Sequence, residues 1–380
     1  MENIYDLAIL GAGPAGICAA IYATRAKLNT IWLDKKFVQG GQIVDTYEVD
    51  NYPGLPGITG LDLGEAMAGH AKKLGMKPQR EQVRSIEAEQ GIKVIRTKKN
   101  EYRARAVIIA CGATHRHLGI PGEEELSGMG VSYCATCDAA FFQDRTVVVV
   151  GGGNVSIDAA RVSSRCTDAK ISMFCLEARE KMPASNEEIE EALEEGIELN
   201  CGWGPKEVLE EDGHVSGVVF KKCTRVFDAQ GRFSPEYDEN DTVTVPCRHV
   251  IFSVGQAIDW GHMLDNLHVE LRPNGGALAN KLTYQTSEPD IFVGGDVYTG
   301  PKFAIDAIAA GREGAISLHR YVHEHCTLTI GRNRRDFIEL DKENIKVETY
   351  DSSSRQIPPK ADVKEQAKTF RDLSQSLTEE

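Results

Sequence analysis

The feature that most constrains this chain is a glycine-rich turn between a strand and a helix, which occurs twice. The first turn, 11–16, follows an apolar run at 5–10 and precedes an apolar helix that starts at Ile17. The second turn, 151–156, follows the apolar run 147–150 and opens another helix. After each helix a second strand ends in an acidic residue, Asp34 and Glu177 respectively. This order predicts doubly wound α/β architecture, in which parallel strands alternate with helices.

Each small residue of such a turn has a physical task. The first glycine permits the tight turn, the second lets the backbone approach a pyrophosphate, and the third allows the helix to pack closely on the strand. The acidic residue can accept a hydrogen bond from a ribose hydroxyl. Ser156 replaces the third glycine of the second turn, a mild change because serine is also small. The sequence therefore predicts two dinucleotide-binding units.

Between the two turns lies the only Cys-x-x-Cys of the chain, Cys134 to Cys137, followed directly by Asp138. Two cysteines at this spacing can close a disulfide ring, bind a metal or lie in a core. In a redox-active pair, one thiolate attacks a partner disulfide and the other resolves the mixed disulfide. Asp138 could then shuttle a proton to the leaving thiolate. We expect no structural zinc, because no second Cys-x-x-Cys or nearby Cys/His pair completes four ligands.

Composition excludes several classes of function. The net charge of −14 argues against nucleic acid or an anionic membrane as the main partner. No apolar run approaches the roughly 20 residues that cross a bilayer, and the N-terminus has no basic region of a signal peptide. We expect a cytoplasmic protein in which the eight scattered cysteines are buried small hydrophobes. Residues 327–380 are polar, and we expect an arm or partial disorder there.

Together these motifs resemble the low-molecular-weight, bacterial-type thioredoxin reductases, which are FAD-dependent pyridine nucleotide-disulfide oxidoreductases. The resemblance covers about 1–325, and it is carried by the stretches 11–16, 40–42, 48–54, 118–123, 130–138 and 294–296. It implies a homodimeric enzyme that passes electrons from NAD(P)H through FAD to the cysteine pair and on to a thioredoxin-like protein. Cys137 would face the flavin, Cys134 would attack the acceptor, and Asp138 would be the acid.

The resemblance also implies the domain organisation. We expect an α/β fold with two Rossmann-like, three-layer nucleotide-binding domains, in which the NAD(P)H domain is inserted into a discontinuous FAD domain. The FAD domain would comprise 1–117 and 250–326, the NAD(P)H domain 118–249 with the redox cysteines, and a C-terminal extension 327–380. Residues 115–120 and 246–250 would connect the two domains and let the NAD(P)H domain swivel.

The same resemblance assigns residues to each cofactor. FAD would be held by Gly11, Gly13, Pro14, Ala15, Gly16, Asp34, Gly41, Gln42, Asn51, Gly112, Gly295, Asp296, Ala304 and Ile305. The pyridine nucleotide would be held by Gly151, Gly153, Asn154, Val155, Ser156, Glu177 and Arg179.

The chain departs from that family in its second nucleotide unit. Members that use NADPH usually carry His-Arg-Arg after the second strand of this unit, whereas this chain has Leu176-Glu177-Ala178-Arg179. A carboxylate repels a 2′-phosphate and can accept bonds from a ribose diol, so we predict that NADH is preferred to NADPH. Arg179 and Lys181 add positive charge nearby.

A second departure supports an alternative function. Lys181–Ser185, 295–311 and 354–358 resemble the glutamate synthase small subunit and its relatives, so the chain could be an electron-transfer flavoprotein subunit docking on a larger enzyme. In those relatives the tail carries cysteines for an iron–sulfur cluster; residues 327–380 contain none, which excludes such a cluster here. The helix after Pro301 also lacks the usual Arg-Gln-Ala, so we expect backbone at its start to hold the flavin N1/O2 side.

Overall fold

The computed structural model describes residues 3–46, 48–49, 51–138, 142–323 and 325–332, with 341, 358–359, 362–366, 369 and 377 of the C-terminal stretch. The chain forms two compact units. The first comprises Met1–Thr114 and Gln256–Phe337, and the second comprises His115–Gly255 and Ile338–Glu380. The chain therefore leaves the first unit after Thr114 and returns to it at Gln256. Two short paired strands, β7 (Thr114–His115) and β16 (Gln256–Ala257), lie at these points.

The first unit is built on a seven-stranded sheet in the order β3-β2-β1-β6-β5-β4, with β17 also paired to β6. The parallel strands are β1 (Ile4–Leu10), β2 (Thr30–Asp34), β3 (Gln79–Arg80), β6 (Glu101–Ile109) and β17 (Ile291–Val293). Strands β4 (Val83–Glu89) and β5 (Ile92–Thr97) run antiparallel. The sequence predicts strands at 5–10 and 30–33 and a strand pair near 92–110, and all of these are confirmed, whereas β3 and β4 were not predicted.

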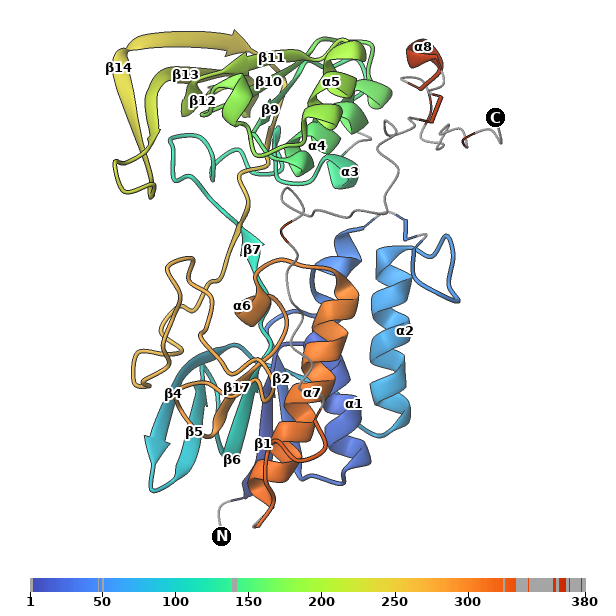
Figure 1. Ribbon diagram of the computed structural model, residues 1–380, viewed down its shortest axis with the longest axis vertical. Helices are drawn as coiled ribbons and strands as arrows, with labels where there is room; N and C mark the ends of the chain where they lie inside the picture. The colour runs from blue at the N-terminus through green and yellow to red at the C-terminus, as the bar shows by residue number, and fades with distance from the viewer. Residues whose placement is uncertain are drawn as a thin grey trace, which may run out of the picture. The chain divides into compact units, whose positions relative to one another are not determined.

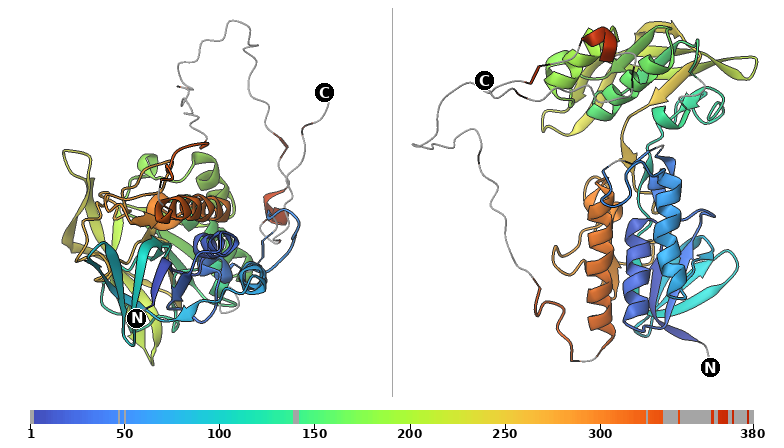
Figure 2. Two further views of the ribbon diagram at one scale, coloured as in Figure 1. Left: turned by 90° about the horizontal axis from the view of Figure 1, so that it is seen from below. Right: turned by 90° about the vertical axis from the view of Figure 1, so that its right-hand side faces the viewer.

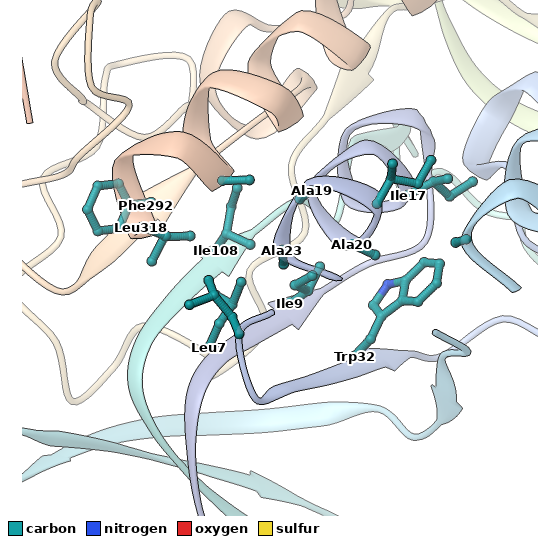
Figure 3. Packing of buried hydrophobic residues seen from close by; sticks show 14 of the residues in the cluster. Leu7, Ile9, Ile17, Ala19, Ala20, Ala23, Trp32, Ile108, Phe292 and Leu318 are labelled. Atoms are coloured by element: carbon teal, nitrogen blue, oxygen red, sulfur yellow. The ribbon is translucent and has the colours of Figure 1, made fainter. Parts of the chain in front are cut away.

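Three helices cover one face of this sheet: α1 (Pro14–Arg25), α2 (Gly60–Lys73) and α7 (Ala304–Val322). They lie side by side in Figure 1 and again in both views of Figure 2. Alternate residues of β1 serve opposite faces, as its side-chain period of two requires. Leu7 and Ile9 pack against the helices (Figure 3), while Ala8 and Leu10 pack on the other face.

Helices α1 and α7 approach so closely that a side chain is excluded between them. A β-carbon added at Gly311 would lie 2.1 Å from the backbone oxygen of Ala15. Likewise, one added at Gly16 would lie 2.0 Å from the backbone oxygen of Gly11. The third glycine of the first turn therefore has the packing task expected of it. Close contact with α1 holds α7, and with it the short helix α6 (Asp296–Thr299, four residues) that precedes it, in the same unit as the glycine turn.

The second unit has three layers. Its central sheet is parallel, in the order β11-β10-β9-β15-β8. These strands are β8 (Val131–Ser132), β9 (Val147–Val150), β10 (Ile171–Cys175), β11 (Glu198–Cys201) and β15 (His249–Phe252). Helices α4 (Asn154–Cys166) and α5 (Asn186–Glu194) pack on one face. An antiparallel sheet of β12 (Trp203–Glu211), β13 (His214–Phe227) and β14 (Phe233–Pro246) packs on the other. The expected fold class, two Rossmann-like α/β units, is confirmed.

The sequence also predicts a hairpin loop at 228–241, an extended loop at 40–42, and a capping box of Ser185 with Glu188, and all three predictions need correction. The polar stretch 228–241 is not a hairpin loop: its turn is confined to 228–232, where Asp228 accepts from two backbone N–H groups, and β14 begins at Phe233. The loop after Gly40 is not extended, because Gly41–Asp45 forms the 3₁₀ helix η1. The capping box of α5 is half formed: Ser185 accepts from the Glu188 N–H, but its own N–H donates to Asn154.

Most of the C-terminal stretch 327–380, where we predicted an arm or disorder, lies outside the described residues. The part that is described packs on the units. Arg332 donates to the Glu313 carboxylate at 2.7 Å and to the Ser317 hydroxyl at 2.7 Å, both on α7. Arg165 of α4 donates to the Thr369 backbone oxygen at 3.0 Å. No helix in the described part of the chain combines the length and apolarity needed to cross a membrane.

We predict that Gly311→Ala destabilises the protein by about 2 kcal/mol, in the range typical of overpacking. The added methyl group meets backbone oxygen, which cannot rotate away, and this cost exceeds the roughly 1 kcal/mol that alanine gains over glycine within a helix. Gly69→Ala in α2 is the matched control, because nothing lies within 4 Å of its β-carbon position. Urea unfolding should show a lower midpoint for Gly311→Ala only. Equal midpoints for the two variants would contradict the close approach of α1 and α7.

Candidate functional site

A pocket of about 190 Å³ in the first unit lies where its parallel strands end. Gly11 follows β1, Asp34 ends β2, Ala110–Gly112 follow β6, and Gly294–Asp296 follow β17. In open parallel sheets, ligands bind outside the carboxyl ends of the strands. The pocket therefore lies at the position where folds of this kind bind their ligands.

The structure brings most of the residues assigned to FAD together around this pocket. They are Gly11, Gly13, Pro14, Ala15, Asp34, Gly41, Gln42, Gly112, Gly295, Asp296 and Ala304. Three assigned residues do not line it. Gly16 lies buried beneath the turn, where it serves packing, and Asn51 and Ile305 are exposed to solvent.

Two glycines and two glutamines join distant segments at the pocket. Gly41, at φ +67°, approaches Gly13 so closely that an added β-carbon would lie 3.0 Å from the Gly13 Cα. The Gln42 side-chain amide donates to the Ala113 backbone oxygen at 2.8 Å. It also accepts from the Gln256 amide at 2.7 Å. Gln256 was not predicted as a site residue, because nothing local in the sequence connects it to Gln42.

A second pocket of about 300 Å³ continues from the first and shares Gly11, Asp34, Lys35 and Cys111 with it. Its other walls are 81–84, at the start of β4, and 259–263. None of these walls was predicted. Asp34 stands where the two pockets meet. Together they form a groove for an elongated ligand, with the glycine turn at its middle.

Burial changes the pKa values of two carboxyl groups in this groove, those of Asp34 and Asp296. It raises the pKa of the Asp34 carboxyl above its usual value, and the Lys35 and Lys36 backbone N–H groups oppose the rise. Burial also raises the pKa of the Asp296 carboxyl, and a hydrogen bond from the Lys302 backbone N–H partly offsets this rise. Ligand hydroxyls that donate to these carboxylates would relieve the cost of their burial. The start of α1 offers N–H groups to a phosphate, as helix N-termini do.

The second unit contains a similar glycine turn, but its acidic residue lies directly beside the turn. Gly151 adopts φ +148°, and Ser156 is buried with its hydroxyl donating to the Gly153 backbone oxygen. The Glu177 carboxylate lies against Gly152: Oε2 is 2.7 Å from where a β-carbon of Gly152 would stand. The structure thus places the acidic residue at the mouth of the turn.

Of the remaining residues assigned to the pyridine nucleotide, Gly153, Asn154 and Val155 lie at the start of α4, and Arg179 begins the 3₁₀ turn η3 (Arg179–Lys181) that precedes α5. Asn154 accepts from the Ser185 N–H at 3.0 Å, and Arg179 donates to Asn186 at 3.2 Å. Val155 is 71% exposed although it is apolar. Exposed apolar side chains at the open end of a nucleotide unit are suited to contact a ligand.

Cys134 lies between β8 and the single turn α3 (Ala135–Asp138) and is disulfide-bonded. The Cys137 side chain lies outside the described residues. Ser132 holds the Cys134 backbone, because its hydroxyl accepts from the Cys134 N–H at 3.1 Å and donates to the Cys134 carbonyl at 3.2 Å. Ser132 was not predicted.

The eight other cysteines are free thiols. The expectation that all of them are buried is wrong for four: Cys111 and Cys326 are exposed, and Cys166 and Cys201 are partly exposed. Cys111 lines the groove of the first unit, at the end of a buried strand. A buried strand therefore does not guarantee a buried residue directly after it.

Asp138 lines a separate pocket of about 520 Å³ in the second unit. The pocket also receives Ser132 and a group of basic residues that the sequence did not single out, namely Arg145, His214, Arg248 and His249. They come from three separate stretches of the chain. Asp138 therefore shares a pocket with four basic side chains, close in sequence to the cysteine pair.

A buried carboxylate fixes the segment that precedes the cysteine pair. Glu123 accepts from the Leu118 N–H at 2.9 Å, the Gly119 N–H at 2.7 Å and the Tyr133 hydroxyl at 2.8 Å. Tyr133 also lies 2.9 Å from His117 Nδ1. Burial, together with Glu123, raises the pKa of Tyr133. The stretch 118–123 is thus tied to the residue next to Cys134, a role that its sequence did not reveal.

Among the residues that the structure describes, no three His, Cys, Asp or Glu side chains are grouped to hold a metal. The features that the structure does show are two nucleotide-type units and the disulfide-bonded Cys134. These features define a class, the flavin- and pyridine-nucleotide-linked disulfide oxidoreductases.

Comparison with known proteins places the chain within that class. Residues 5–311 match the family described as pyridine nucleotide-disulphide oxidoreductase. A thioredoxin reductase of Listeria monocytogenes is 33% identical over 91% of this chain and 98% of its own length. One of Peptoclostridium acidaminophilum is 43% identical over 58% of this chain and 69% of its own length. A crystal structure of Lactococcus lactis thioredoxin reductase has a TM-score of 0.70 at 30% identity, covering 84% of this chain and 99% of that one.

The chain belongs to the pyridine nucleotide-disulphide oxidoreductases and, within them, to the thioredoxin reductase family. It is an enzyme, a flavoprotein disulfide reductase, and the resemblance found in its sequence is confirmed.

We predict that Asp296→Asn raises the stability of the flavin-free protein at pH 7. The folded-state pKa of this carboxyl lies above its ordinary value of 3.8, so the ionised group opposes folding at high pH. This opposition fades as the pH falls through the raised pKa toward 3.8, so the difference between variant and wild type should shrink on acidification. Thermal unfolding between pH 7.5 and about pH 4.5 measures this. The exposed Asp241→Asn is the control. A variant less stable than wild type at pH 7 would contradict it.

Proposed function

We propose that this enzyme takes electrons from a nicotinamide nucleotide, preferably NADH, and delivers them through FAD and the Cys134/Cys137 pair to a thioredoxin-like protein. One observation carries the proposal: Cys134 is disulfide-bonded within the unit that also carries the second glycine turn. The relatives named above are thioredoxin reductases, which supports a thioredoxin-like acceptor. The homodimer and the cytoplasmic location expected from the sequence stay predictions.

The groove of the first unit fits FAD. Its glycine turn leaves no side chain between Gly13 and Gly41, so a pyrophosphate can approach the backbone at the start of α1. Asp34 would accept from the adenosine ribose, and the pocket at 81–84 and 259–263 would hold the adenine. FAD held there would supply the two-electron transfer that links a nicotinamide to a disulfide. The start of α7, where Ala304 lines the pocket, would face the flavin ring.

Glu177 supports the preference for NADH. Its carboxylate lies against Gly152, where the ribose of a nucleotide on this turn would lie. A ribose diol can donate hydrogen bonds to a carboxylate, whereas a 2′-phosphate brings a second negative charge to it. Arg179, the cation closest in sequence, donates to Asn186 on α5.

The cysteine pair would transfer the electrons to the acceptor by thiol–disulfide exchange. Cys134 would attack the acceptor disulfide and Cys137 would resolve the mixed disulfide. Asp138 would hold or return the proton, since its N–H bonds to the Cys134 carbonyl at 3.3 Å and its side chain lines the adjoining pocket.

Substituting either cysteine tests the proposal. We predict that Cys134→Ser and Cys137→Ser each lower NADH-dependent disulfide reduction by at least about a hundredfold, because a serine hydroxyl cannot complete the exchange. Both variants should retain FAD, whose groove lies in the other unit. Steady-state assays with a panel of thioredoxins, together with flavin absorbance, measure both effects. Cys166→Ser, at a free thiol of the same unit, is the control. Undiminished turnover in either active-site variant would refute the proposed relay.

Removing the Glu177 charge tests the nucleotide preference. We predict that wild type favours NADH in kcat/KM and that Glu177→Gln lowers the NADH-to-NADPH ratio by about tenfold, equivalent to ~1.4 kcal/mol. Parallel anaerobic titrations with the two nucleotides would report the same shift in flavin reduction. Glu180→Gln is a matched control, because Glu180 is an exposed glutamate three residues away. A wild type that prefers NADPH would show that the charge argument is wrong.

A further inference from the structure

A second pair of cysteines lies in the second unit, apart from Cys134 and Cys137. Cys175 ends β10 and Cys201 ends β11, and the parallel register places them directly opposite each other. Their Sγ atoms are 3.7 Å apart, and both are free thiols. Met182 adds a third sulfur, since its Sδ lies 4.0 Å from the Cys201 Sγ.

The geometry of this pair is compatible with a disulfide. Neighbouring strands lie about 4.8 Å apart, and disulfides join residues whose Cα atoms are about 4.4–6.8 Å apart. Directly paired residues point to the same face of a sheet. Closing the bond to about 2.05 Å therefore requires the two sulfurs to approach by about 1.6 Å, within reach of side-chain rotation.

The pair is linked to Glu177, the residue that we propose selects the nucleotide. The Cys175 thiol donates to the Glu177 backbone oxygen at 3.5 Å. The same oxygen accepts from the N–H of Gly202, the residue after Cys201, at 3.1 Å. The Cys175 Cβ also lies 3.4 Å from the β-carbon position of Gly152 in the glycine turn. Movement of either sulfur is therefore transmitted to the backbone that carries Glu177.

We propose that Cys175 and Cys201 are a second, regulatory redox pair, which a small-molecule disulfide oxidises to an internal disulfide that weakens nucleotide binding at the adjacent turn. Closing the bond removes the Cys175 hydrogen bond to Glu177 and draws together the ends of β10 and β11, beside which the turn lies.

The exchange proceeds in two balanced steps. The Cys201 thiolate attacks a disulfide R–S–S–R, which forms Cys201–S–S–R and releases RS⁻. Cys175 then attacks the Cys201 sulfur, which forms the internal disulfide and releases the second RS⁻. The two thiol protons leave with the two RS⁻ groups as 2 RSH, so the protein loses two electrons and the small disulfide gains them.

The environment assigns the order of these steps. Cys201 is partly exposed, so an oxidant can reach it first. Cys175 is buried, and burial, together with the neighbouring Cys201, raises its pKa. A buried thiol of raised pKa is a poor first nucleophile but is well placed to resolve a mixed disulfide on its neighbour.

Oxidised glutathione is a suitable probe. We would treat FAD-loaded full-length protein in which Cys134 and Cys137 are both serine, so that the other redox pair is absent. The peptides that carry 175 and 201 should together lose about 2 Da and hold no glutathione, because closing one disulfide removes two hydrogens. Glutathione taken up by the exposed thiols Cys111 and Cys326 is mapped separately. Peptide mapping should join the peptides of 175 and 201. NADH affinity, measured by equilibrium binding, should weaken by at least about fivefold and recover with dithiothreitol.

Variants separate this pair from the other thiols. Cys201→Ser and Cys175→Ser should each prevent the mass change and the loss of affinity, and Cys175→Ser should retain one glutathione on Cys201. Cys223→Ser, at a buried thiol on β13, should behave as the parent protein does. A disulfide that forms without Cys175 or Cys201, or glutathione attached to each of them, would overturn the inference.

Only the effect on NADH rests on the proposed function. If the reduced protein does not bind NADH while the 175–201 disulfide forms, the proposed function fails and the redox pair stands. If NADH binds equally well before and after the disulfide forms, the regulatory role fails and the proposed function stands.

Discussion

The structure depends on backbone approaching backbone at positions where no side chain fits. Gly16 against Gly11, Gly311 against Ala15, and Gly41 against Gly13 each leave less space than a methyl group needs. These contacts pack α1 on its strand, α7 on α1, and the loop after β2 on the glycine turn. Their combined effect is that segments some 300 residues apart in the sequence, represented by Gly11 and Ala307, line one groove. A larger side chain at any of them would separate the walls of that groove.

The two units use one architecture for different tasks because their strand ends carry different residues. In the first unit Asp34 is flanked by Lys35 and Lys36, and the groove extends past it toward β4. In the second unit Glu177 lies directly against its glycine turn. Both carboxylates stand where a ribose is bound in such folds. The first arrangement suits a long ligand held throughout turnover, and the second suits one that is exchanged in every cycle.

Much of the fold and part of the site could be predicted because their signals are local. A buried strand, a glycine turn and an acidic residue lie within about 30 residues of each other, and the strand order follows from repeating that unit. The missed features are non-local. Gln256 meets Gln42 only after folding, and Glu123 meets Tyr133 only because the turns at 121–130 bring them together. The full extent of β14 was missed for another reason: its first part, 233–241, is mostly polar, so this part lacks the apolar alternation that marks a strand.

The same distinction explains why the cysteines were difficult to interpret. Cys134 and Cys137 are adjacent on one turn, so their spacing alone indicates a pair. Cys175 and Cys201 are far apart in sequence and become neighbours only through the parallel register of β10 and β11. A sequence that shows one redox pair can therefore contain two. Because the second lies beneath the turn that would receive the electron donor, its oxidation state would act on the supply of electrons, whereas the first pair acts on their delivery.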